Sequence, residues 1–267
     1  MEVKFNHPYS YDLATTQFFT TKSALDSIHN SENIMIIDGS IEWSSNSGCK
    51  IDGQVSKEVI FIGLDDAIGQ GNKILKQFGV TAFLEVSYES KVPLGSRSFV
   101  EVVITKREKS RSGAMKTFCS ATMMSESKKV QASATALFID KKSLHSSPVI
   151  KRGDMTERFE IKRLKPLDHS IVLNYHSMVS LSDHVVNWHD GQGPKECVHG
   201  GVMSIPVFHS ISEKVNAIHI NFRRPISLGS ESEISLKRDS ENSKRLNFAI
   251  MQKESSDMQF NGFAVTE

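Results

Sequence analysis

An internal repeat restricts the folds open to this chain more than any other feature of the sequence. Residues 79–96, GVTAFLEVSYESKVPLGS, align with residues 214–230, KVNAIHINFRRPISLGS. Apolar positions of the two copies correspond, so that Leu84 falls on Ile218, and both copies end in Leu-Gly-Ser. Three further strand-like segments follow each copy. We therefore predict two modules of the same architecture in tandem.

Hydrophobic periodicity defines the elements of each module. Apolar residues recur mostly at three- and four-residue steps over residues 59–78, which predicts a long helix in the first module. An earlier helix is expected at residues 22–28. Alternating or β-rich segments predict strands at 34–41, 81–88, 99–106, 115–124 and 130–139, and in the second module at 215–222, 231–238, 245–252 and 258–265.

Residues 141–156, KKSLHSSPVIKRGDMT, interrupt this regular pattern. They carry Pro, Gly, Ser and charged residues without periodicity, which is typical of a linker. We predict an N-terminal module at 1–142, a linker at 143–157 and a C-terminal module at 158–267. The role of residues 1–30 is left open.

Charge and cysteine content narrow the function classes. The chain has 32 Lys and Arg against 31 Asp and Glu, a balance that gives no electrostatic reason to expect nucleic acid or an anionic membrane surface. The chain has three cysteines, Cys49, Cys119 and Cys197. Because their number is odd and they lie far apart in the sequence, they favour a reducing, cytoplasmic setting without disulfides. The N-terminus does not read as a secretory signal, and no apolar run approaches the roughly 20 residues of a membrane span. We expect a cytoplasmic protein without nucleic-acid or membrane partners.

Short motifs in both modules resemble those of a known enzyme family. Residues 199–201 read His-Gly-Gly before an apolar segment, and residues 64–70 read LDDAIGQ. A helix followed by an antiparallel meander, present twice, resembles the hotdog fold. The motifs resemble HGG-type thioesterases, the phenylacetyl-CoA thioesterase-like group. This resemblance implies an α+β double hotdog, in which two antiparallel sheets are each wrapped around a central helix and join into one continuous sheet.

The two modules depart from the family pattern in complementary ways. In the family, a catalytic Asp follows the His by nine residues. Nine residues before Asp65, Ser-Lys-Glu at 56–58 replaces His-Gly-Gly, and nine residues after His199, Phe208 replaces the acid. Thr81 occupies the position of a family Ser or Thr that faces the acid. The pattern predicts one composite site, with the acid and the hydroxyl from one module and the glycine turn from the other. Independent decay of both halves is the alternative.

The resemblance implies a role for each catalytic candidate. Gly200 would be the principal backbone donor to the developing oxyanion, because a glycine at a helix start lets a carbonyl oxygen approach the free N–H groups. Asp65 would attack the carbonyl or activate a water, which Thr81 would position. His199 belongs to the same turn. Each assignment has a structural alternative. His199 would have a purely structural role, the glycines would form a simple tight turn, and Thr81 would be an ordinary strand residue.

Three further residues are assigned to substrate binding. Gly201 extends the glycine turn, and Gln192 lies near the position of a family Asn or Gln that holds the substrate carbonyl. Asp66 is next to the catalytic candidate, and only the LDD register favours Asp65 over it. No cofactor or metal is expected, since His184 and His189 lack third and fourth ligands at suitable spacing. The substrate would be a thioester of coenzyme A or of the phosphopantetheine arm of acyl carrier protein, and basic residues at 106–112 or Arg223-Arg224 could meet its phosphates.

Three functions follow from these residues. The first is hydrolysis of an acyl-CoA or acyl-carrier-protein thioester, in which the acid lies on the long helix. The second is an enoyl-CoA hydratase or 3-hydroxyacyl dehydratase, because Asp183 and His189 resemble a pair in R-specific enoyl-CoA hydratases, although Asn187-Trp188 replaces the Asn-Pro of that family. The third is a non-catalytic acyl-thioester-binding protein. The sequence leaves open the length of the acyl chain and the choice between coenzyme A and acyl carrier protein. It also leaves open whether the chain assembles as a homodimer or a larger homo-oligomer.

Overall fold

The computed structural model describes residues 15–17, 35–43, 53–74, 79–111, 113–140, 160–163, 197–198, 201, 204–224, 226–227, 232–252 and 258–267. These residues form two compact units, one containing the described residues from 15 to 140 and the other those from 160 to 267. The helix predicted at 22–28 and the linker predicted at 143–157 lie outside the described residues. The domain boundaries therefore remain predictions.

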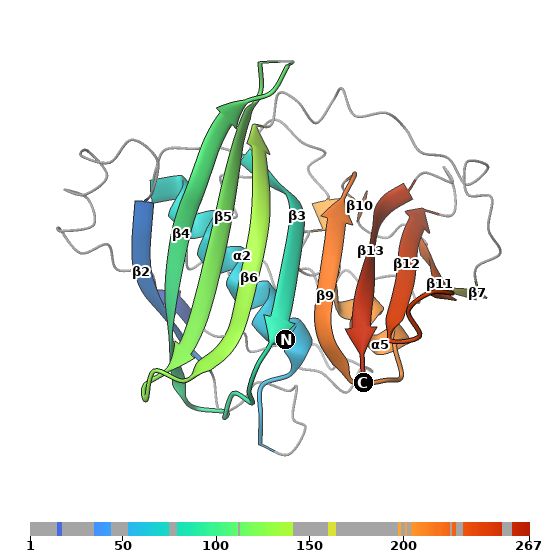
Figure 1. Cartoon of the computed structure of the whole chain (residues 1–267), viewed down its shortest axis with the longest axis horizontal. Helices are drawn as coiled ribbons and strands as arrows, with labels where there is room; N and C mark the ends of the chain where they lie inside the picture. The colour runs from blue at the N-terminus through green and yellow to red at the C-terminus, as the bar shows by residue number, and fades with distance from the viewer. Residues whose placement is uncertain are drawn as a thin grey trace, which may run out of the picture. The chain divides into compact units, whose positions relative to one another are not determined.

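The N-terminal unit is an antiparallel sheet with a long helix against one face (Figure 1). Side chains alternate across the sheet, so that Val100, Val102 and Ile104 of one strand are buried while their neighbours are more exposed. The predicted long helix and the predicted strands of this module are confirmed, with ends that differ by at most four residues. The helix is α2 (Lys57–Ile74), and the sheet order is β1 (Thr15–Gln17), β2 (Met35–Glu42), β4 (Arg97–Lys109), β5 (Met115–Ser125), β6 (Val130–Asp140) and β3 (Gly79–Tyr88).

Helix α2 is buried over most of its first three turns. At the start of the helix, the Ile60 N–H donates a backbone hydrogen bond to the Ser56 carbonyl at 3.1 Å. Leu64, Ala67 and Ile68 are fully buried, as the helical periodicity predicts. Gly63 faces the indole of Trp43, and a Cβ at this position would lie 3.0 Å from Trp43 Cη2. An added methyl at this position would therefore require the Trp43 ring to shift.

The C-terminal unit repeats the antiparallel arrangement with a much shorter helix, α5 (Ser204–Ser210) (Figure 1). Ile218 and Ile220 are fully buried, as are Leu84 and Val86 at the corresponding positions of the first repeat. The four strands predicted in this module are confirmed. The sheet order is β9 (Val215–Phe222), β13 (Met258–Thr266), β12 (Arg245–Gln252), β11 (Ser232–Arg238) and β7 (Glu160–Arg163), and β8 (Cys197–Val198) pairs separately with β10 (Ile226–Ser227).

The sequence patterns did not predict the strands β1, β7, β8 and β10. Each has only two to four residues, too few for an alternating pattern to be recognised. Among the helices that the structure describes, none has the length and apolar character needed to cross a membrane.

Candidate active site

The structure brings two of the predicted site residues together. The Thr81 hydroxyl, on β3, donates a hydrogen bond to Asp65 Oδ1, on α2, at 3.0 Å. Asp65 is 5% exposed, and Thr81 is partly buried. The two residues are 16 positions apart in sequence, and they meet because β3 passes beside the helix that precedes it. An acid and a hydroxyl in direct contact can hold and activate a water molecule.

Buried apolar residues lie close to Asp65 in the sequence of α2. Leu64, Ala67 and Ile68 on the same helix are all fully buried. Burying a carboxylate is costly unless hydrogen bonds compensate, so an acid here is a marked exception to the apolar pattern of α2. Such exceptions concentrate at functional sites, where the chemistry requires them.

A second polar group lies at the start of α2. The Tyr88 hydroxyl donates to the Lys57 carbonyl at 3.0 Å, and the Lys57 ammonium lies 5.2 Å from the centre of the Tyr88 ring. Burial raises the pKa of Tyr88 well above its usual value, and the nearby Glu58 carboxylate raises it further. Tyr88 therefore stays protonated and acts here as a hydrogen-bond donor that ties β3 to the first turn of the helix.

The glycine turn is described only at Gly201. Gly201 is buried in a turn, and its carbonyl accepts hydrogen bonds from the backbone N–H and the hydroxyl of Ser204, at 3.1 and 2.6 Å. These contacts place Gly201 one turn ahead of α5. His199, Gly200 and Gln192 lie outside the described residues, as does the side chain of Asp66, so their roles stay predictions. The same holds for Asp183 and His189.

The C-terminal sheet carries an ordered polar face that the sequence reasoning missed. The Arg245 guanidinium carbon lies 3.9 Å from the centre of the Phe263 ring, which stacks on His219 at 5.1 Å. Asn247 accepts from Arg245 Nε at 3.1 Å and donates to Asp239 at 3.2 Å. His219, Arg245, Asn247 and Phe263 line a surface hollow of about 300 Å³, and none of the predicted site residues lines it. In the sequence, this face could have been found from the polar residues that alternate with apolar residues along these strands.

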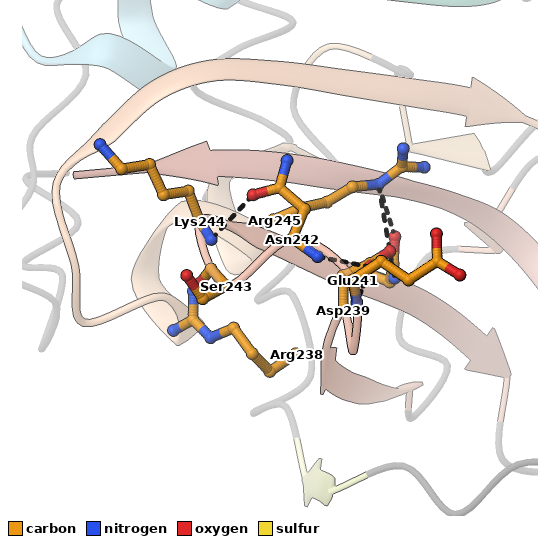
Figure 2. A network of polar contacts seen from close by, with 8 residues as sticks. Arg238, Asp239, Glu241, Asn242, Ser243, Lys244 and Arg245 are labelled. Atoms are coloured by element: carbon orange, nitrogen blue, oxygen red, sulfur yellow. Dashed lines mark hydrogen bonds and ion pairs between the residues drawn. The ribbon is translucent and has the colours of Figure 1, made fainter.

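The turn between β11 and β12 anchors one end of this face (Figure 2). Asp239 accepts from the backbone N–H groups of Glu241 and Asn242, at 2.9 and 3.1 Å, and its carboxylate lies 3.8 Å from Arg245. The Glu241 N–H, followed by the Asn247 amide and the Asn242 N–H, lowers the pKa of Asp239. This turn is a structural feature, because its side-chain hydrogen bonds satisfy its own backbone.

The basic segments proposed to meet phosphates are exposed and at least partly paired with other side chains. Lys106 forms an ion pair with Glu108 at 2.5 Å, which lowers the pKa of Glu108. The Arg223 guanidinium donates to Asn261 Oδ1 at 3.2 Å. Among the described residues, no group of three or more His, Cys, Asp or Glu side chains is placed to hold a metal ion.

The sequence matches no family model, and no curated protein matches it significantly. Solved structures do share its fold. The chain superposes on the acyl-ACP thioesterase of Bacteroides thetaiotaomicron with a TM-score of 0.57 and 10% identity, covering 87% of this chain and 98% of that one. For HtdX of Mycobacterium tuberculosis the TM-score is 0.59 at 9% identity, with 86% and 100% covered.

A third likeness is to the peroxisomal multifunctional enzyme type 2 of Drosophila melanogaster, with a TM-score of 0.60 and 9% identity. It covers 87% of this chain, which spans about half (48%) of that enzyme. At such low identity these likenesses establish the fold, which is the hotdog fold. The particular chemistry of this chain depends on its own residues.

Proposed function

We propose that this protein hydrolyses acyl thioesters and that Asp65 and Thr81 carry out the activation step. The observation that carries the proposal is the 3.0 Å hydrogen bond between the Thr81 hydroxyl and the buried Asp65 carboxylate. The names of structural neighbours support acyl-thioester chemistry, since they include acyl-ACP thioesterases from two organisms.

In the proposed reaction, Asp65 acts as general base and removes a proton from a water held by the Thr81 oxygen. The hydroxide attacks the thioester carbonyl carbon, the tetrahedral intermediate collapses with cleavage of the carbon–sulfur bond, and the proton held by Asp65 passes to the leaving thiolate. The products are the free acid and the thiol of the carrier. The sequence assigns stabilisation of the oxyanion to the backbone N–H of Gly200, and this part of the proposal rests on the His-Gly-Gly pattern.

Hydration of an enoyl thioester is the second candidate. The pair Asp183 and His189 in the sequence favours it, and the neighbours include proteins named MaoC-like dehydratases. The two functions place the essential acid at different positions. Substitution of Asp65 therefore separates them.

The test measures thiol release from acyl-CoA and acyl-carrier-protein thioesters of increasing chain length. Asp65→Asn keeps the shape of the side chain but removes its basicity, and kcat should fall about a hundredfold or more. Thr81→Val removes one hydrogen bond and should cost about tenfold. Glu126→Gln, at an exposed turn, is the matched control and should leave kcat unchanged.

Each alternative outcome would show which part of the proposal is wrong. A loss of activity in Asp66→Asn but not in Asp65→Asn would show that the LDD register was misassigned. Thiol release that survives both substitutions would reject Asp65 and Asp66 as the essential acid. Hydration of crotonyl-CoA, followed by its absorbance and lost in Asp183→Asn, would establish the second candidate in place of hydrolysis.

A further inference from the structure

The surface hollow of about 300 Å³ lies on the face of the C-terminal sheet that is opposite the core. Ile218 and Ile220 of β9 are fully buried. His219 and Asn221 alternate with them, are partly exposed and line the hollow. The hollow has the volume of roughly ten water molecules, so it can hold a small organic ligand.

Two adjacent rows of side chains across the sheet frame the hollow. The first row takes one directly opposed residue from each of four neighbouring strands: His219, Phe263, Asn247 and Lys237. The second row has three opposed residues: Asn221, Asn261 and Ala249. Ala249 has the shortest side chain of the two rows, so it forms the floor of the hollow.

Two cations line the hollow, and no carboxylate of the described residues does so. The register of β11 and β12 makes Lys237 and Arg245 diagonal neighbours on one face, with Cα atoms about 7–8 Å apart. The Asp239 carboxylate lies 3.8 Å from Arg245 Nε, but it also accepts from the backbone of its own turn and from Asn247. Two cations placed so close together favour an anion between them.

The Arg245 guanidinium is held in place while its terminal nitrogens remain available. Its Nε donates to Asn247 Oδ1 at 3.1 Å, and its central carbon lies 3.9 Å from the centre of the Phe263 ring. Its two Nη groups donate to no described residue, and Figure 2 shows them directed away from the turn between β11 and β12. A guanidinium fixed in this way is suited to a bidentate bond with a phosphate or a carboxylate.

Two asparagines supply uncharged donors at the other end of the hollow. Asn221 and Asn261 are directly opposed across β9 and β13. The Arg223 guanidinium donates to Asn261 Oδ1 at 3.2 Å, and His219 Nε2 lies 3.2 Å from Asn221 Oδ1. Neither asparagine donates from Nδ2 to a described residue, so both can donate to the hydroxyl oxygens of a ligand.

We propose that this hollow binds a small hydroxylated organic anion. Arg245 and Lys237 bind its phosphate or carboxylate group, and Asn221 and Asn261 bind its hydroxyl groups. Lys237 and Asn261 are two strands and two residues apart, about 12 Å between Cα atoms, so a ligand several bonds long contacts both ends better than an inorganic ion. This binding site is independent of the proposed hydrolysis at Asp65.

Calorimetry with ribose 5-phosphate and ribonate as probes tests the proposal and distinguishes the two anionic groups. The wild type should bind at least one of them with a Kd below about 1 mM. It should bind ribose and inorganic phosphate about tenfold more weakly, because each lacks one half of the contacts. Tighter binding of ribose 5-phosphate would identify a phosphate ligand, and tighter binding of ribonate would identify a carboxylate.

Substitutions locate the binding site. Arg245→Gln should weaken binding of the better probe about tenfold or more, because it removes charge-assisted hydrogen bonds. Arg111→Gln removes the same charge from an exposed turn and is the matched control, with an unchanged affinity. Asn261→Ala should weaken binding about fivefold, the value of one uncharged hydrogen bond.

Three results would overturn the proposal. The first is a wild type that binds neither probe, and the second is an equal loss in Arg245→Gln and Arg111→Gln. The third is inorganic phosphate that binds as tightly as the probes, because the asparagines would then contribute nothing. If Arg245→Gln does not fold, chemical-shift changes in the wild type decide. They should centre on Arg245, Asn261 and their strand neighbours, and changes confined to other residues reject the site.

Discussion

A buried chain of hydrogen bonds joins three elements of the N-terminal module and makes a sharp stability prediction. The Trp43 indole N–H donates to the Ser98 hydroxyl at 2.7 Å, and this hydroxyl donates to Gln131 Oε1 at 2.6 Å. Ser98 is completely buried, and Trp43 and Gln131 are each 3% exposed. Removing the Ser98 hydroxyl therefore leaves one buried donor and one buried acceptor without their partner.

Each buried group left without a partner costs about 1–3 kcal/mol, so Ser98→Ala should lower the free energy of unfolding by about 2–6 kcal/mol. Urea denaturation followed by far-UV circular dichroism measures this value. Ser127→Ala, at an exposed turn, is the matched control and should change stability by less than about 0.5 kcal/mol. A loss below about 1 kcal/mol in Ser98→Ala would refute the reasoning, because it would mean that both groups find new partners.

Three further predictions concern single positions. Gly63→Ala should lower the melting temperature, although alanine has the better helix propensity, because the added methyl would lie against Trp43 Cη2. Trp43→Phe removes that atom, and in this background the same change should be neutral or stabilising. Because burial raises the pKa of Cys119 to about 11, its thiol should resist iodoacetamide at pH 8 until the protein is unfolded, and rapid labelling of the native protein would contradict this. Gly262→Ala would place a methyl 1.8 Å from the His219 carbonyl oxygen, so the C-terminal module should lose its native near-UV circular dichroism, whereas an unchanged spectrum would reject the close approach.

Local patterns in the sequence determined the elements of both modules. The apolar periodicity that predicted a helix at 59–78 corresponds to α2, and the alternation in the two repeat copies corresponds to β3 and β9. These predictions succeed because helix and strand periods are properties of adjacent residues. The short strands β7 and β8 were missed, since pairing with distant partners creates them and their own residues carry no period.

A resemblance to known motifs also predicted that Asp65 and Thr81 face each other. Only the tertiary structure placed the Thr81 hydroxyl 3.0 Å from the Asp65 carboxylate. It also showed that Asn72 is buried with an unsatisfied oxygen, which sequence spacing cannot show because any of its partners can come from a distant strand. Periodicity is local and can be read from the chain, whereas burial and hydrogen bonding depend on which remote residues the fold brings together.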